Sequence, residues 1–218
     1  MKCIFKIYVA TTFFLFLGIY AFGQNNAQAI LDQVSKKYSS FKTIKADFVL
    51  TGINEIETGA GYDEKGRVYL EPGTKKYKIE TAQQAFISDG KTQWAVMKDI
   101  GEVQITNLNP DDASISPSNI FSFYKTGYRT ESKNQQTADG RTLYVIDLTP
   151  LDENQNISKI RMRIDKSTNF IYDATISDKN GNTYTYKLSN IETNRTFSPG
   201  IFSFYKHNYP DLEIVDLR

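Results

Sequence analysis

The stretch Lys159-Ile160-Arg161-Met162-Arg163-Ile164-Asp165 decides the fold class of this chain, because apolar and charged residues alternate through it without a break. Successive side chains of a strand point to opposite faces of a sheet. Ile160, Met162 and Ile164 therefore share one face, and the charged residues share the other. The stretch predicts an antiparallel strand that buries one face and keeps the other in water.

The same period of two recurs on both sides of this stretch. It is found in Ala46 to Leu50, Val68 to Leu70, Lys76 to Glu80 and Thr183 to Leu188. Clusters of Gly, Asn and Asp separate these segments at intervals of about ten residues, as in an antiparallel meander. We therefore predict a mainly β (α+β) protein built on a single curved antiparallel sheet. A sheet with one charged face curls its apolar face inward, here as an unclosed β-barrel around an apolar cavity.

Two segments follow a helical period instead. In Asn25 to Phe41, apolar residues recur at helical spacing with polar residues between them, which predicts an N-terminal helix. Asn109 to Ser118 is rich in Pro, Asp and Ser, and Ser116-Pro117 offers a helix start. The residues that follow are apolar nearly all round, which predicts a short lid helix over an apolar opening. The lid residues are Ile120, Phe121, Phe123 and Tyr124.

The hexapeptide Ile-Phe-Ser-Phe-Tyr-Lys occurs twice, at 120–125 and at 201–206, each time after a Ser-Pro pair. The remaining flanks differ, so we interpret the two copies as local similarity and not as a repeat of the fold. We expect a helix in the first copy and a short turn with a strand in the second.

The N-terminal residues have the features of an export signal. Lys2 and Lys6 precede an apolar core from Ile7 to Phe22, and Ala21-Phe22-Gly23 fits a cleavage site. We expect a signal peptide over 1–23 that is cleaved at or near Gln24. The rest of the chain, 24–218, is expected to form one soluble, monomeric domain. The alternative is a retained membrane anchor, because the core is only slightly short of the roughly 20 residues that span a bilayer.

Charge and composition exclude several functions. Removing Lys2 and Lys6 from 26 basic residues leaves 24 against 25 acidic ones, so nucleic acid is not an expected partner. The one cysteine, Cys3, lies in the predicted signal, and His207 is the one histidine. We therefore expect no catalytic site, metal or cofactor, and so no enzyme. Asp178, Asn180 and Asn182 imitate a calcium loop, but the later positions do not fit, which indicates a hairpin turn.

A family resemblance appears at Ser88-Asp89-Gly90-Lys91-Thr92-Gln93-Trp94. A strand that ends in Asp-Gly-Lys and restarts with Trp resembles the bacterial outer-membrane lipoprotein carrier family, LolA. Other stretches match in the same order along the chain: Ala46-Asp47-Phe48, Gly66 to Gly73, Tyr144 to Pro150, Ile160 to Ile164, Phe202-Ser203-Phe204 and Val215 to Arg218.

The resemblance implies a carrier in the periplasm of a Gram-negative bacterium. Such a carrier holds the acyl chains of lipoproteins in a lidded cavity and shuttles them from the inner to the outer membrane. The implied partners are acylated lipoproteins, an inner-membrane lipoprotein-releasing ABC transporter and an outer-membrane acceptor. A periplasmic lipid or lipopeptide sensor on the same fold is the alternative. The cargo and the acceptor are not named by the sequence.

The chain departs from the family at one position. Glu71 stands where the family has an arginine that helps to hold the lid, and Lys75, Lys76 or Lys78 are candidates to replace it. The cavity itself is predicted from the apolar positions of the alternating strands. These are Phe48, Leu50, Val68, Leu70, Tyr77, Ile79, Trp94, Val96, Ile146, Leu148, Met162, Ile164, Tyr186 and Leu188.

Overall fold

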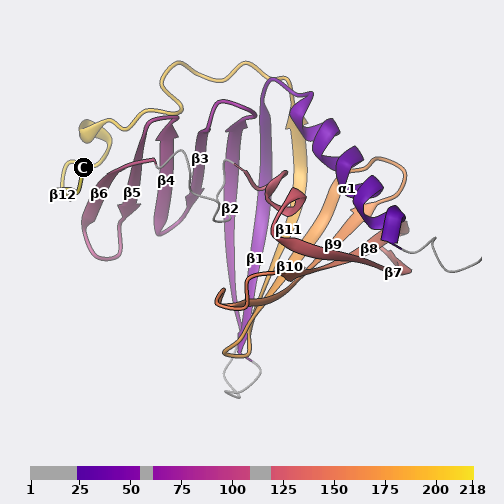
Figure 1. Cartoon of the computed structure of the whole chain (residues 1–218). Coiled ribbons are helices and arrows are strands. Elements are labelled where there is room, and N and C mark those ends of the chain that lie inside the picture. Colours follow the sequence, from indigo (N-terminus) through magenta and orange to yellow (C-terminus); the bar gives the residue numbers. More distant parts are fainter. Residues whose placement is uncertain (1–23, 55–60, 109–118) are drawn as a thin grey trace, which may run out of the picture.

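In the computed structural model of the protein, residues 24–54, 61–108 and 119–218 are described. The predicted signal peptide over 1–23 and the segment Asn109 to Ser118 lie outside these ranges. In the described part, one α-helix lies across one face of a long curved sheet (Figure 1). We call the face that carries this helix the inner face, and the opposite one the outer face.

The elements follow one another in two runs of strands. The helix is α1 (Gln24–Ser39), and the first run is β1 (Ile44–Asn54), β2 (Tyr62–Glu71), β3 (Lys76–Thr81), β4 (Gln84–Asp89), β5 (Thr92–Met97) and β6 (Glu102–Asn107). The second run is β7 (Tyr128–Ala138), β8 (Arg141–Pro150), β9 (Ile157–Asp165), β10 (Ile171–Asp178) and β11 (Asn182–Thr193). The remaining elements are the 3₁₀ helices η1 (Phe123–Lys125) and η2 (Lys206–Asn208) and the last strand, β12 (Glu213–Asp216).

Each run is an antiparallel meander, and the pairing of β1 with β11 joins the two runs. The order of the described strands across the sheet is β12-β6-β5-β4-β3-β2-β1-β11-β10-β9-β8-β7. Since β7 and β12 stay at opposite edges, the sheet is not closed. This confirms the predicted mainly β fold with one curved, unclosed antiparallel sheet and an N-terminal helix. The exception to antiparallel pairing is β12, which runs parallel to β6.

The strand on which the fold prediction was based, Lys159 to Asp165, lies within β9. Ile160, Met162 and Ile164 are each at most 1% exposed and lie in the core beneath α1. The helix contributes Ala27, Ile30, Leu31, Val34 and Tyr38 to the same core. It ends two residues before Phe41, because the backbone N–H of Ser40 already bonds the carbonyls of Lys36 and Lys37 and the chain then extends into β1.

The charged face of β9 carries arginines that are paired with buried carboxylates. Arg161 donates two hydrogen bonds of 2.7 and 2.8 Å to Asp147, a carboxylate that is only 7% exposed. Arg163 binds Asp173 in the same two-pronged way. Paired carboxylates of this kind hold neighbouring strands in register, because both oxygens are satisfied at once.

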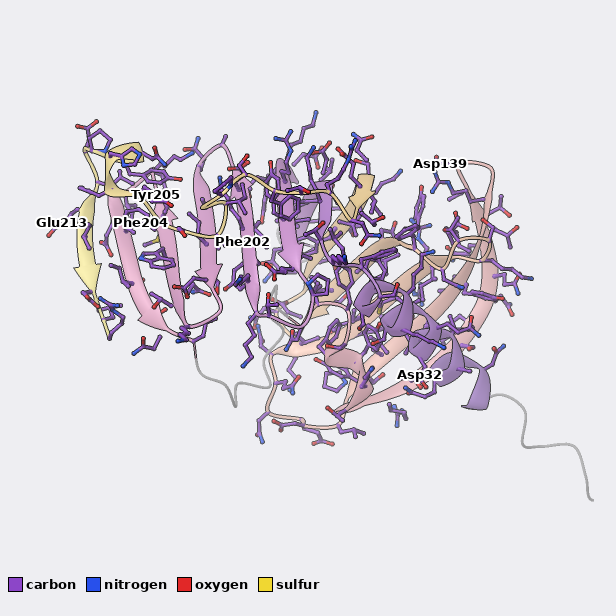
Figure 2. The ribbon with its side chains drawn as sticks, turned by 90° about the horizontal axis from the view of Figure 1, so that it is seen from above. Asp32, Asp139, Phe202, Phe204, Tyr205 and Glu213 are labelled. Carbon is purple, nitrogen blue, oxygen red and sulfur yellow. The ribbon has the colours of Figure 1, made fainter. Side chains whose placement is uncertain are left out.

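The second copy of the hexapeptide contains no strand, contrary to expectation. Its residues form turns within the segment from Phe197 to Leu212, which we call the C-terminal strap. The strap lies on the outer face, where Phe204 stacks between Trp94 and Tyr209 at centroid distances of 6.3 and 5.6 Å (Figure 2). The first copy forms turns and η1, which is shorter than the predicted helix.

The Arg161–Asp147 pair predicts an acid dependence of stability. The hydrogen bonds from Arg161 hold the pKa of Asp147 below its ordinary value of 3.8. A carboxyl group whose pKa is lower in the folded state stabilises that state at pH values above its unfolded-state pKa. This stabilisation is lost as the pH falls through the folded-state pKa. In thermal melts, Asp147→Asn should melt at a lower temperature than the parent at pH 7 and should lose less stability between pH 5 and pH 3.

Asp211→Asn is the matched control, because Asp211 is exposed. It should melt at the same temperature as the parent at pH 7. A parent-like slope for Asp147→Asn would show that the pair does not contribute to the acid transition.

Candidate ligand-binding face

Strand register decides which of the predicted cavity residues share the inner face. Leu50 pairs with Tyr186, Tyr186 lies beside Ala174, and Ala174 pairs with Met162. Paired residues point to the same side of a sheet, so these positions share one face. The same reasoning places twelve of the predicted residues on the inner face: Phe48, Leu50, Val68, Leu70, Tyr77, Ile79, Ile146, Leu148, Met162, Ile164, Tyr186 and Leu188.

Trp94 and Val96 lie on the outer face, so the prediction was wrong for these two residues. Ile79 pairs with Phe86, and Phe86 with Ala95, which makes Ala95 the inward residue of β5. Val96 packs against Ala85 and Val103, and Trp94 packs against the C-terminal strap. In β4 and β5, the residues of both faces are apolar, because the strap covers the outer face. Alternation alone therefore does not show which residues point inward.

The inner face divides into a filled half and a reachable half. Beneath α1, Ile146, Leu148, Met162 and Ile164 are fully buried. Away from α1, five of the predicted residues are only half-buried. They are Leu50, Val68, Ile79, Tyr186 and Leu188. An apolar stripe that is left partly in water next to a packed core is a candidate site for an apolar ligand.

Phe48 lies at the boundary between these halves. A Cβ atom built on Gly66 would come within 2.3 Å of the Phe48 ring, so a glycine is needed for the ring to lie against β2. A depression of about 440 Å³ opens nearby, but most of the residues around it, including Asp47, Lys65 and Arg67, belong to the outer face. Phe48 also lines this depression, which therefore opens mainly on the outer face and shares one residue with the predicted cavity.

The first hexapeptide packs over the core as a lid. The Phe121 ring stacks on Tyr38 with a centroid distance of 3.7 Å and an interplanar angle of 13°. Tyr124 is 1% exposed, and its hydroxyl donates to the carbonyl of Leu31 at 3.4 Å. Phe123 is half-buried, whereas Ile120 is 38% exposed and lies outside the packed core.

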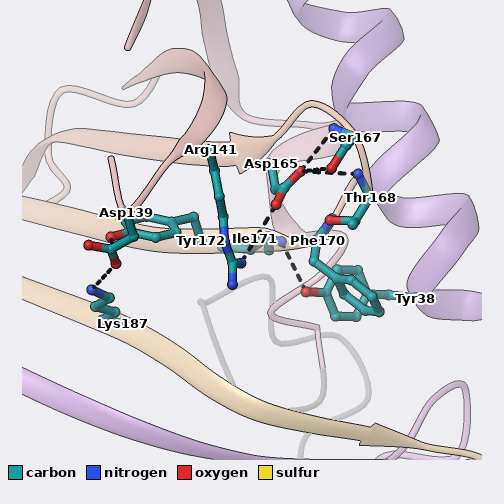
Figure 3. A network of polar contacts seen from close by, with 10 residues as sticks. All are labelled: Tyr38, Asp139, Arg141, Asp165, Ser167, Thr168, Phe170, Ile171, Tyr172 and Lys187. Carbon is teal, nitrogen blue, oxygen red and sulfur yellow. Dashed lines mark hydrogen bonds and ion pairs between the residues drawn. The ribbon is translucent and has the colours of Figure 1, made fainter. Parts of the chain in front are cut away.

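Tyr38 connects this lid to the sheet. Its hydroxyl accepts the backbone N–H of Ile171 at 3.1 Å (Figure 3). Burial raises the pKa of Tyr38, so the hydroxyl stays neutral at physiological pH. The loop that presents Ile171 is held by Asp165, which accepts from the backbone N–H groups of Ser167 and Thr168 (Figure 3).

The ion pairs of Glu71 and Lys78 stay within the β2–β3 hairpin. Glu71 lies 3.6 Å from Lys76, and Lys78 lies 2.7 Å from Glu80. The Phe121–Tyr38 stack and the hydrogen bond from the Tyr124 hydroxyl to the carbonyl of Leu31 connect the described part of the lid to α1. Neither ion pair reaches the described part of the lid.

The described residues contain no group of three or more His, Cys, Asp or Glu that could hold a metal ion. Within the described ranges, no helix is both long and apolar enough to cross a bilayer. His207 is exposed in η2, next to the ring of Tyr205.

Solved structures of other proteins share this architecture. An uncharacterized conserved protein from Thermus thermophilus has a TM-score of 0.59 at 14% sequence identity, covering 87% of this chain and 98% of that one. A putative outer membrane lipoprotein-sorting protein domain from Vibrio parahaemolyticus has a TM-score of 0.46 at 13% identity, covering 83% and 97%. LprF from Mycobacterium bovis has a TM-score of 0.47 at 15% identity, covering 81% and 96%. The first of these supports the fold.

No curated protein sequence matches the chain. The family model that matches is described as outer membrane lipoprotein carrier protein LolA, and it covers residues 39–205. The match begins at the last residue of α1 and ends inside the C-terminal strap, so it includes both meanders and the lid. The chain therefore belongs to the outer membrane lipoprotein carrier protein LolA family.

Proposed function

We propose that this protein carries lipoproteins through the periplasm of a Gram-negative bacterium, with their acyl chains held against the inner face of the sheet. The observation behind this proposal is the half-buried apolar stripe of Leu50, Val68, Ile79, Tyr186 and Leu188, next to an aromatic lid. Membership in the LolA family agrees with it. The proposed role is binding and transport, without chemical change to the cargo.

The energetics of such a site require a lid. Burying an acyl chain of about a dozen methylenes gains roughly 10 kcal/mol, at about 0.8 kcal/mol for each methylene. Two or three chains would approach the practical ceiling of affinity, and the cargo would not be released. A lid that packs its own rings over the core weakens net binding, because the ligand first displaces protein contacts.

The lid contacts are suited to displacement by an apolar ligand. The Phe121–Tyr38 stack and the hydrogen bond from Tyr124 to Leu31 link the lid to α1. Apolar contacts exchange readily for the methylenes of an acyl chain, because neither state exposes the core to water. An acyl chain that extends from the half-buried stripe toward α1 would thus compete with the lid for the same contacts.

A carrier of this kind needs a donor and an acceptor. We propose that an inner-membrane lipoprotein-releasing ABC transporter loads the protein and that an outer-membrane acceptor receives the cargo. The signal peptide over 1–23 would be removed during export, leaving a soluble, monomeric shuttle that begins near Gln24.

Leu50→Glu tests the site directly. Leu50 lies half-buried on the inner face, so the new carboxylate would have to be desolvated when an acyl chain binds. The variant should fold but fail to bind an apolar fluorescent probe. In cells that depend on this protein, lipoproteins should accumulate in the inner membrane.

Val49→Glu is the matched control. Val49 is the adjacent residue of β1, is also half-buried, and points to the outer face. It should bind the probe and sort lipoproteins normally. If Leu50→Glu also sorts lipoproteins normally, transport is refuted, and probe binding without sorting would favour the sensor.

Phe121→Ala tests the lid. Removing the ring leaves Tyr38 without its stacking partner, so a ligand has less protein contact to displace. We expect the variant to bind the apolar probe several-fold more tightly than the parent in a fluorescence titration.

Phe202→Ala provides an internal comparison, because Phe202 occupies the same position in the second hexapeptide but packs against Phe197 on the strap (Figure 2). Its probe affinity should equal that of the parent. Weaker binding by Phe121→Ala would mean that this ring forms part of the binding surface.

A further inference from the structure

Two buried hydroxyl groups have no hydrogen-bond partner among the described residues, those of Ser35 and Ser132. Ser35 lies on the packed side of α1 and is 1% exposed. Ser132 lies on β7 and pairs with Ile146 of the core, so its side chain points to the inner face. Because α1 packs against β7 (Figure 1), both hydroxyls belong to the region where the helix covers the sheet.

The lid explains why the Ser35 hydroxyl lacks its ordinary partner. A serine inside a helix commonly bonds the carbonyl four residues earlier, which here belongs to Leu31. That carbonyl accepts the Tyr124 hydroxyl instead. Burial raises the pKa of Tyr124, and the nearby Ser35 hydroxyl lowers it by a smaller effect, yet the two oxygens do not meet hydrogen-bond geometry.

Unpaired hydroxyls are unfavourable in such surroundings. A buried hydroxyl gives up its bond to water and gains nothing in return, so native cores contain few of them. The neighbouring core residues Ile146 and Leu148 are fully buried and apolar. An alanine at either serine position would therefore suit this packing better, and a ligand atom that accepts from these hydroxyls would be favoured.

We propose that Ser35 and Ser132 donate hydrogen bonds to the ester or amide carbonyl oxygens of bound acyl chains, once α1 and the lid have yielded to the ligand. This inference rests on the proposed carrier function and adds the chemical group that is recognised. A hydroxyl can donate, and the carbonyl is the strong acceptor closest to the hydrocarbon of an acyl chain. The site thereby distinguishes acylated molecules from alkyl chains of equal length.

The test compares a short-chain diacyl phospholipid with its dialkyl ether analogue of equal chain length. Both displace an apolar fluorescent dye from the purified protein, below the concentration at which either forms micelles. The parent should bind the ester about three- to tenfold more tightly than the ether, as expected for one or two hydrogen bonds. Ser35→Ala/Ser132→Ala should bind both ligands equally, with unchanged affinity for the ether.

Ser158→Ala is the matched control, because Ser158 is exposed on β9 and its hydroxyl bonds the carbonyl of Ser177. It should keep the ester preference. Without ligand, the double variant should melt at a higher temperature than the parent, since two unpaired hydroxyls are removed.

The outcomes separate this inference from the carrier proposal. Equal affinity of the parent for ester and ether overturns the inference and leaves the carrier proposal intact. A preference that survives in the double variant, or a lower melting temperature of that variant, also overturns it. If neither lipid displaces the dye, the carrier proposal fails together with the inference.

Discussion

The pairing of β1 with β11 is the contact on which the rest of this structure depends. It joins residues as distant in sequence as Ile44 and Thr193. Without it, the chain would form two separate meanders, each with its own exposed edge. With it, the apolar sides of the two meanders become one continuous inner face. Contacts of such sequence separation form slowly, because the loop between them has to be closed first.

This continuous face has two regions that differ in burial. Under α1, the side chains are almost fully buried, and they supply the stability that a chain without disulfides needs. Beside α1, the same face is only half-covered, and a ligand can approach it. The lid lies over the packed half, where Phe121 stacks on Tyr38 and the Tyr124 hydroxyl donates to the carbonyl of Leu31.

Alternation of apolar residues was sufficient to predict the sheet and most of its inner face. It succeeded where one face of a strand is charged, as in β9, because the residues of the two faces then differ in polarity. It failed for Trp94 and Val96, since β4 and β5 are apolar on both sides and the sequence carries no sign of which side the strap would cover. The two hexapeptides show the same limit, because identical residues form turns on opposite faces. Whether the inner-face residues hold acyl chains remains a prediction.

The pairing of Arg161 with Asp147 was not visible in the pattern either. Alternation assigns both residues to the polar face, but it does not show that the carboxylate is buried beneath the guanidinium. Such pairs depend on strand register, which follows from the whole sheet and not from one segment.

The C-terminal strap touches the outer face at well-separated strands. Phe197 packs on Tyr69 of β2, Phe204 on Trp94 of β5, and β12 pairs with β6. A segment fixed at three points across a sheet acts as a tether of constant length. Any change in the curvature of β2 to β6 must therefore either slide the aromatic contacts or strain the chain between them. The curvature of the inner face is thus set in part by the length of a segment on the other side of the sheet.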